Sequence, residues 1–414
     1  MRVLHVTRDF PPLSKGGIST AVGGLVAAAA AAGHHLWVLS FDAWRPKAHP
    51  GGLALPAAEV GGRVRVQRLR APHHIAEVAA AVAGFAPAVV HVHHAMLWRA
   101  ALELAPDARR LLSVHVIQAE MNRLRGVSHT LSATAQAEAL AEADVVHVPS
   151  APAASLLLRF HPEIAARLRV VPPGVDASGV DASGVEAIGV DAPRAIATPA
   201  PSRSRTVVAV GRFDHAKGTA DLAAALPQLI AAVPGVSVRI VGGVPDNPRA
   251  ARRWQRRLEE AGGEHVQCLG WRPPPAVAAE LAGAAVGLFP SHAETFGLAL
   301  LEAMAHGVAA VATDVAGHRA LLLGDDLGGR GPVAPAQVRG VLVPTQSPTA
   351  LAEATAALLA RPDRAAAIGQ SARQFAQTLA WSVIWPQWQA LLRDTAIQSR
   401  RGQSSPGQSS MGQS

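Results

Sequence analysis

Two glutamates, Glu294 and Glu302, stand in a segment that is otherwise rich in small and apolar residues. The segment follows the strand-like run from Ala285 to Phe289 and enters an apolar helical stretch near Gly297. We therefore expect Glu294 in the loop between strand and helix, and Glu302 inside the helix. A carboxylate buried among apolar neighbours needs a partner, and a pair of ligand hydroxyls would be one. The alternative for Glu302 is a surface position on an amphipathic helix.

The same segment offers backbone amides to an anion. In a parallel α/β sheet, a loop between strand and helix lies at the carboxyl edge, where ligands bind. A helix that begins near Gly297 would present the N–H groups of Phe296, Gly297 and Leu298 at its positive end. The sequence therefore predicts an anion-binding helix N-terminus beside Glu294.

A second group of residues, from Gly211 to Gly218, follows the strand-like run Thr206 to Val210 and contains Arg212 and Lys217. The planar fork of Arg and the compact ammonium of Lys both suit phosphate oxygens. Only three of the 38 basic residues are lysines, so a lysine kept in this loop is informative. An ordinary loop lysine is the alternative interpretation.

Two further signals are weaker when taken alone. Gly16 and Gly17 would let the backbone approach a ligand closely, although glycine pairs before a helix are common. His115 closes the run that starts at Leu111, at the carboxyl end of another predicted strand. A lone histidine is more often structural than catalytic, and a comparable strand end carries His91, His93 and His94.

These residues need a scaffold that brings strand ends together. Strand-like runs alternate with helical stretches in two series, one from Val3 to Val171 and the other from Thr206 to Val343. Such alternation indicates βαβ units and parallel sheets. The sequence therefore predicts two doubly wound α/β domains, over residues 1–172 and 206–379.

The segments outside these domains are repetitive. Four pentads in register run from Gly174 to Pro193, and we interpret residues 173–205 as a low-complexity linker without chemistry of its own. Residues 399–414 repeat a Gly-Gln-Ser motif that is too polar to pack, so disorder is expected there.

The composition fits a large α/β protein. The chain has 414 residues, 49% hydrophobic, which is enough for two cores. Its net charge of +8 would suit nucleic acid, an anionic membrane or a phosphorylated substrate, but the densest basic stretch, Arg249 to Arg257, fits one solvated helix face. The single cysteine, Cys268, excludes a disulfide framework. With no convincing signal peptide or membrane span, we expect a soluble cytoplasmic protein.

Several motifs are absent from the sequence. No lysine follows a glycine, so a Walker A loop is excluded. No Gly-x-Gly-x-x-Gly follows the first strand, which disfavours a nicotinamide dehydrogenase. The chain also lacks His-Glu-x-x-His, paired cysteines and Asp-x-Asp. Phosphate handling without a metal or other cofactor is the remaining expectation.

With these motifs in place, the chain resembles the retaining glycosyltransferases of family 4, which have the two-Rossmann-domain GT-B architecture. The resemblance runs from Met1 to about Arg393. Its most specific part is the pair Glu294 and Glu302 with seven residues between them, the E-x7-E signature of the family. It implies two Rossmann-like domains facing across a cleft, with a final helix, residues 380–398, that returns to the first domain.

The resemblance also implies roles for the donor-side residues. Arg212 and Lys217 would hold the donor diphosphate, and the amides of Phe296, Gly297 and Leu298 would meet its phosphates. Glu302 would bind the ribose hydroxyls, and Glu294 would face the donor sugar.

Further roles are implied around the diphosphate. Gly16 and Gly17 would close over it from the first domain, and His115 would lie near the transferred sugar and the acceptor. The base would lie near Gly242 and Arg272.

The implied reaction moves a hexose-type sugar, with retention and without a metal, from a nucleotide diphosphate donor to an acceptor hydroxyl. UDP is favoured as the nucleotide. Alternatives are a GT-B relative acting as an epimerase or phosphorylase, and a basic nucleic-acid-binding protein. The tryptophans of the last helix are expected to pack on the first domain, with peripheral membrane contact as the alternative. The acceptor and the oligomeric state stay open.

Overall fold

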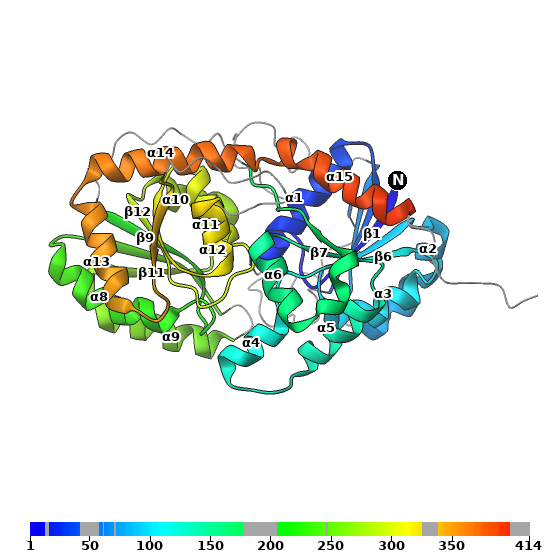
Figure 1. The fold of residues 1–414 in the computed structure, drawn as a ribbon, viewed down its shortest axis with the longest axis horizontal. Coiled ribbons are helices and arrows are strands. Elements are labelled where there is room, and N and C mark those ends of the chain that lie inside the picture. The colour runs from blue at the N-terminus through cyan, green and yellow to red at the C-terminus, as the bar shows by residue number, and fades with distance from the viewer. Residues whose placement is uncertain are drawn as a thin grey trace, which may run out of the picture.

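Short β-branched runs between Ala-rich helices form two sheets, each in its own lobe of the molecule (Figure 1). The computed structural model describes residues 1–12, 16–41, 58–60, 62–69, 72–176, 205–244, 247–324 and 338–397. The pentad repeats beyond Asp176 and the tail from 399 to 414 lie outside these residues. The two-domain α/β architecture predicted from the sequence is confirmed.

The first sheet has the strand order β3-β4-β2-β1-β5-β6-β7-β8. Its strands are β1 (Arg2–Thr7), β2 (His35–Ser40), β3 (Ala58–Val60), β4 (Val64–Arg68), β5 (Val89–Val92), β6 (Arg109–Ser113), β7 (Val145–Val148) and β8 (Leu168–Val170). Every neighbouring pair is parallel except β3 with β4. The antiparallel edge strand was not predicted, because three residues carry too little pattern.

The helices of this lobe cover both faces of the sheet. They are α1 (Gly17–Ala31), α2 (Ala76–Phe85), α3 (Trp98–Leu104), α4 (Gln118–Arg125), α5 (Leu131–Glu142) and α6 (Ala151–Phe160), with 3-10 turns η3 (Pro72–Ile75), η4 (Ala95–Leu97) and η5 (Pro162–Arg167). Strands buried on two faces read as continuous apolar runs, which is why the sequence revealed most of them.

The second sheet is parallel and has the order β11-β10-β9-β12-β13-β14. Its strands are β9 (Thr206–Arg212), β10 (Ser237–Gly243), β11 (Val266–Gly270), β12 (Val286–Phe289), β13 (Ala309–Thr313) and β14 (Gly340–Val343). Its helices are α8 (Thr219–Ala232), α9 (Pro248–Gly262), α10 (Pro274–Ala282), α11 (Leu298–Ala305), α12 (Ala316–Leu323), α13 (Pro348–Leu359) and α14 (Pro362–Thr378), with η6 (Gly263–His265).

The strand order reverses between β9 and β12. From β9 the chain proceeds outward to β10 and β11, whereas from β12 it proceeds the other way to β13 and β14. Ligands of open α/β sheets bind at such a reversal, outside the carboxyl ends of the strands. The loops after β9 and β12 carry Lys217 and Glu294, so the topology itself brings these two residues together.

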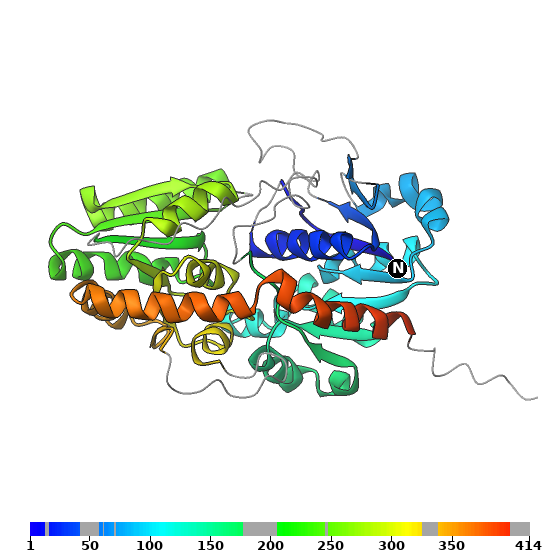
Figure 2. The ribbon, with the colours of Figure 1, turned by 90° about the horizontal axis from the view of Figure 1, so that it is seen from above.

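The last helix, α15 (Trp381–Ile397), leaves the second lobe and lies along the first (Figure 2). Trp388 is buried, and its Nε1 donates to the carbonyl of Pro172 at 3.0 Å. Gly24 of α1 leaves room for the indole of Trp381, because a Cβ there would lie 2.1 Å from its Nε1. The tryptophans therefore pack on the first domain. Among the described helices, none is long and apolar enough to cross a membrane.

Candidate active site

The loops after β9 and β12 are joined through their backbones. The N–H of His292 donates to the carbonyl of Ala216 at 2.8 Å. Gly218 has a positive φ of 63°, and a Cβ on it would lie 1.9 Å from the carbonyl oxygen of Pro290. Only glycine permits this approach, so Gly218 holds the Lys217 loop against the Glu294 loop.

Lys217 and Glu294 form an ion pair through Nζ and Oε1. Glu294 also accepts a hydrogen bond from Ser291 Oγ at 3.2 Å. Burial alone would raise the pKa of Glu294, but Lys217, His318 and the hydrogen bond from Ser291 together lower it below its usual 4.5. Glu294 is thus a carboxylate beside a cation, at the place where the sequence predicted a sugar and a diphosphate.

Arg212 lies at the end of β9, on the exposed side of the same loop. Its Nη2 is 3.2 Å from Oδ2 of Asp214, while the other oxygen of Asp214 accepts from the backbone N–H of Lys217 at 2.9 Å. Asp214 therefore orders the loop, and both predicted phosphate-binding cations start from one short segment.

Glu302 is partly buried on α11 among apolar neighbours. Within the described part of the chain, its carboxylate has no hydrogen-bond or ion-pair partner. Burial raises its pKa from 4.5 to about 7. Glu302 is thus not a fully exposed surface glutamate, and its carboxylate is the kind of group that a pair of ligand hydroxyls would stabilise.

The helix start beside Glu294 is packed against α12. Gly297 has a φ of 96° and precedes the first residue of α11, Leu298. A Cβ on Gly317 would lie 2.5 Å from the backbone nitrogen of Phe296, and the N–H of Gly317 donates to the carbonyl of Glu294 at 2.9 Å. Contacts with α12 thus hold the predicted anion-binding segment in place.

His318 is a site residue that the sequence analysis did not identify. It is 1% exposed, and its Nδ1 lies 2.9 Å from the carbonyl of Thr313. It is one of the groups that lower the pKa of Glu294. No motif in the sequence pointed to it, because its position behind Gly297 depends on how α12 packs.

Helix α1 of the first lobe contacts the start of α11. A Cβ on Gly17 would lie 3.1 Å from Cδ1 of Leu298, so the start of α1 lies against the start of α11. Gly16 precedes α1, and a Cβ there would meet nothing within 4 Å. The predicted glycine pair and the predicted anion-binding amides therefore come together from the two lobes.

Thr295, the residue after Glu294, bridges the lobes by two hydrogen bonds. Its Oγ1 donates to the carbonyl of His115 at 2.7 Å, and its own carbonyl accepts from Ser150 Oγ at 2.7 Å. Ser150 also caps α6. His115 thus lies next to the Glu294 loop, and its role beside the sugar and the acceptor stays a prediction.

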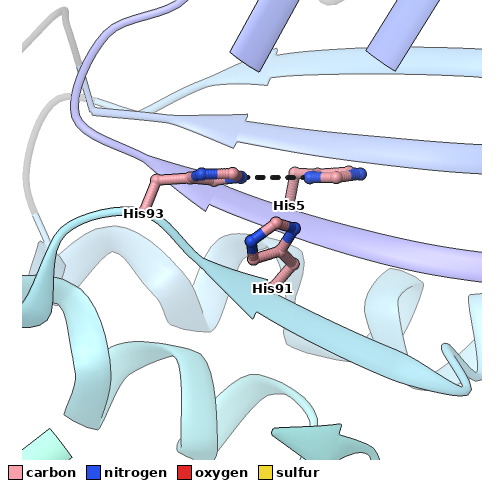
Figure 3. Close-up of side chains that lie close together, drawn as sticks. All are labelled: His5, His91 and His93. Atoms are coloured by element: carbon pink, nitrogen blue, oxygen red, sulfur yellow. Dashed lines mark hydrogen bonds between the residues drawn. The ribbon is translucent and has the colours of Figure 1, made fainter. Parts of the chain in front are cut away.

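The histidines near His115 form a cluster at the carboxyl end of the first sheet. His5 on β1, His91 on β5 and His93 just after β5 point toward one another (Figure 3). His5 and His93 are 3.2 Å apart at Nδ1 and Nε2, and Nδ1 of His93 lies 3.2 Å from Nε2 of His115. Burial lowers the pKa of all four rings, that of His5 to about 3, so they are neutral.

Gly242 and Arg272, predicted near the base, occupy the ends of β10 and β11. Gly242 has a φ of 139°, and a Cβ on it would lie 1.7 Å from the carbonyl oxygen of Gly211. Backbone packing alone therefore requires glycine at this position. Arg272 is exposed after β11, the strand at the outer edge of the sheet. Contact of either residue with a base stays a prediction.

Replacing Thr295 by Val should lower kcat/KM about tenfold, because one hydrogen bond that holds the Glu294 loop against His115 is lost while the shape is kept. Thr295→Ser should keep most of the activity. Thr355→Val is the matched control, since Thr355 Oγ1 donates to the carbonyl of Leu351 at 2.6 Å inside α13. Equal activity of the Val and Ser variants at position 295 would contradict the bridging role.

Two family models together match most of the chain. Residues 15–178 match Glycosyltransferase Family 4, and residues 204–361 match Glycosyl transferases group 1. Each model covers one lobe of the structure, in the order the fold requires. The chain therefore belongs to the family 4 type of glycosyltransferase with the GT-B fold.

Individual relatives agree with this class. D-inositol 3-phosphate glycosyltransferase of Segniliparus rotundus is 30% identical over 274 residues, which cover 64% of this chain and 56% of the relative. The chain thus spans little more than half the length of that protein in the alignment. Glycogen synthase of Mycobacterium tuberculosis is 26% identical over 98% of this chain and 97% of its own.

Solved structures share the fold. Sucrose-phosphate synthase from Thermosynechococcus elongatus has a TM-score of 0.75 at 24% identity, covering 95% of this chain and 98% of that one. Anabaena HepE in complex with UDP-glucose has a TM-score of 0.70 at 17% identity, covering 95% of this chain and all of that one. The predicted GT-B architecture is confirmed.

Proposed function

We propose that this protein transfers a hexose-type sugar from a nucleotide diphosphate donor to an acceptor hydroxyl, with retention of configuration and without a metal. One observation carries the proposal. The loops that carry Arg212 and Lys217 and the start of α11 lie at the strand-order reversal, where α1 of the other lobe contacts Leu298. One turn into α11 stands Glu302, whose carboxylate has no partner among the described residues. These groups match the parts of such a donor: a diphosphate and a ribose.

The charges of the site suit the departure of a nucleotide diphosphate. Negative charge develops on the leaving phosphate, and preorganised cations and amides stabilise such charge best in a water-poor site. Lys217, now paired with Glu294, would turn to the phosphate when the donor binds. Glu294 would then be released to the hydroxyls of the sugar, close to its present position.

Retention assigns Glu294 to sugar binding rather than to covalent catalysis. The attacking hydroxyl would approach from the same face as the leaving phosphate, which would take up its proton. In this scheme His115 borders the sugar and the acceptor from the first lobe, held in place by Thr295.

UDP is the nucleotide we propose, in keeping with the family resemblance. The printed names of the relatives include an inositol phosphate glycosyltransferase and a glycogen synthase, so phosphorylated polyols and α-glucans are the first acceptors to test. An epimerase or phosphorylase would use the same donor site. A nucleic-acid partner has less support, because the densest group of arginines is exposed along the single helix α9: Arg249, Arg252, Arg253, Arg256 and Arg257.

Thermal unfolding with UDP-, GDP-, ADP- and dTDP-sugars tests the donor assignment. A donor that binds only the folded state must raise the unfolding temperature, by the equivalent of about 2.7 kcal/mol at a hundredfold excess over its Kd. We expect the largest shift with a UDP-sugar, and the same shift with EDTA present. No shift with any donor would contradict the proposal. Product analysis then separates transfer from epimerisation and from phosphate-dependent cleavage.

A further inference from the structure

Two hydrogen-bonded chains of side chains cross the carboxyl end of the first sheet, on the face covered by α1 and α15. One joins His5, His93 and His115. The other runs from His91 through Ser113 and His147 to the carbonyl of Val171, with contacts of 2.7, 2.8 and 2.7 Å. The chains start side by side, because His5 and His91 are register partners on β1 and β5.

The second chain has only one possible direction. The carbonyl of Val171 can only accept, so Nε2 of His147 carries the proton and its Nδ1 accepts from Ser113 Oγ. Ser113 in turn accepts from Nε2 of His91. Nδ1 of His91 is then an unprotonated nitrogen, and it has no partner within the described residues.

The first chain contains only neutral imidazoles, each with one proton. Each N–H···N contact uses one proton, so the three rings must carry their protons in the same order, all on Nδ1 or all on Nε2. The far nitrogen, Nε2 of His5, is buried and has no partner in the described part of the chain. An unpartnered buried N–H is rarer than an unpartnered buried acceptor, so this end of the chain favours the order with every proton on Nδ1.

The grouping of His5, His91 and His93 also has the spacing of metal ligands, with one nitrogen of each within 4.8 Å of the others. The orientation of the rings argues for a shared proton instead. His5 and His93 lie edge to edge within 13° of one plane, and their nitrogens face each other directly at 3.2 Å (Figure 3). Lone pairs that point at one another do not converge on a cation.

We propose that His5 and His93 are positioning residues that fix the tautomer of His115, so that this ring meets the substrate in a single hydrogen-bonding state. His115 is the end of the chain that reaches the site, because Thr295 donates to its carbonyl. With Nε2 engaged by His93, Nδ1 is the nitrogen left for a hydroxyl of the sugar or acceptor. The importance of this nitrogen for turnover rests on the proposed function, whereas the coupling of the three rings does not.

Nitrogen-15 NMR of the full-length protein with labelled histidines tests the coupling directly, since protonated and unprotonated ring nitrogens have well-separated shifts. We expect His5, His93 and His115 to share one tautomer. In His5→Leu, His115 should become a mixture of tautomers while His147 is unchanged. An unchanged His115 in that variant, or unlike tautomers in the wild type, would overturn the proposal, whatever the protein's activity.

Turnover gives a second readout. His5→Leu should lower kcat about five- to tenfold with little change in the KM of the donor, the effect of one lost hydrogen bond. In His5→Asn the side-chain amide nitrogen lies where Nδ1 of the histidine does, so this variant should recover most of the lost kcat. His91→Leu is the matched control, because His91 is equally buried, on the neighbouring strand, in the chain that does not reach His115. An equal loss in His91→Leu would mean that packing alone is responsible, and the proposal would fail.

Discussion

Lys217→Ala should lower kcat/KM about 100- to 1,000-fold, the usual cost of removing one preorganised group that stabilises transition-state charge. The loss should appear mainly in kcat, because the charge on the leaving phosphate grows during the reaction. The measurement is steady-state transfer with the donor that gives the largest thermal shift. Lys217→Arg should retain part of the activity, since it keeps the charge but not the compact geometry.

Two further variants distinguish a catalytic role of Lys217 from a loss of stability or of surface charge. Lys217→Ala also leaves the carboxylate of Glu294 without its cation, so Lys217→Ala/Glu294→Gln should regain thermal stability but not turnover. Arg249→Ala, which removes an exposed cation from α9 in the same lobe, should be indistinguishable from the wild type. Near-normal turnover of folded Lys217→Ala would remove Lys217 from the mechanism.

Glu302→Gln should have opposite effects on stability and on donor binding. In the folded protein the pKa of Glu302 is raised from 4.5 to about 7, so the folded state binds the proton more tightly than the unfolded state does. The wild type therefore loses stability as the pH rises from 4.5 through 7, by at most about 3 kcal/mol. Glutamine carries no charge, so the variant without ligand should be the more stable protein at pH 8 and equal to the wild type near pH 4.5.

The affinity of Glu302→Gln for the donor should fall, although its stability at pH 8 rises. A carboxylate that accepts from ribose hydroxyls contributes about 1.5–3 kcal/mol, so the variant should bind UDP roughly ten- to a hundredfold more weakly at pH 8. Calorimetric titration and thermal unfolding across pH measure both effects. Glu280→Gln is the control of opposite sign, because its hydrogen bonds from Arg239 hold the pKa of Glu280 below its usual value. A less stable Glu302→Gln at pH 8 would show that this carboxylate already has a partner.

Much of the fold could be predicted because buried parallel strands are short apolar runs separated by helices. The same pattern located Glu294 and Lys217 at strand ends. It could not decide whether Glu302 was buried, because the helix is apolar on several faces. The structure shows Glu302 partly buried on α11, which packs against both β13 and α14.

The residues that escaped prediction are those whose partners come from another element or another lobe. The hydroxyls of Thr295 and Ser150 find these hydrogen-bond partners only where the two lobes pack together. His318 stands in no motif that we interpreted, yet its packing behind Gly297 makes it a neighbour of Glu294. His5 and His93 are 88 residues apart, and only the pairing of β1 with β5 brings them together.

The position of α15 bears on how the chain is made. The first lobe emerges from the ribosome long before Trp381, yet Trp388 completes its core and covers His91 and His147. During synthesis that face of the sheet therefore lacks its final helix until the whole second lobe has been translated. The first domain to be synthesised is thus the last to be finished.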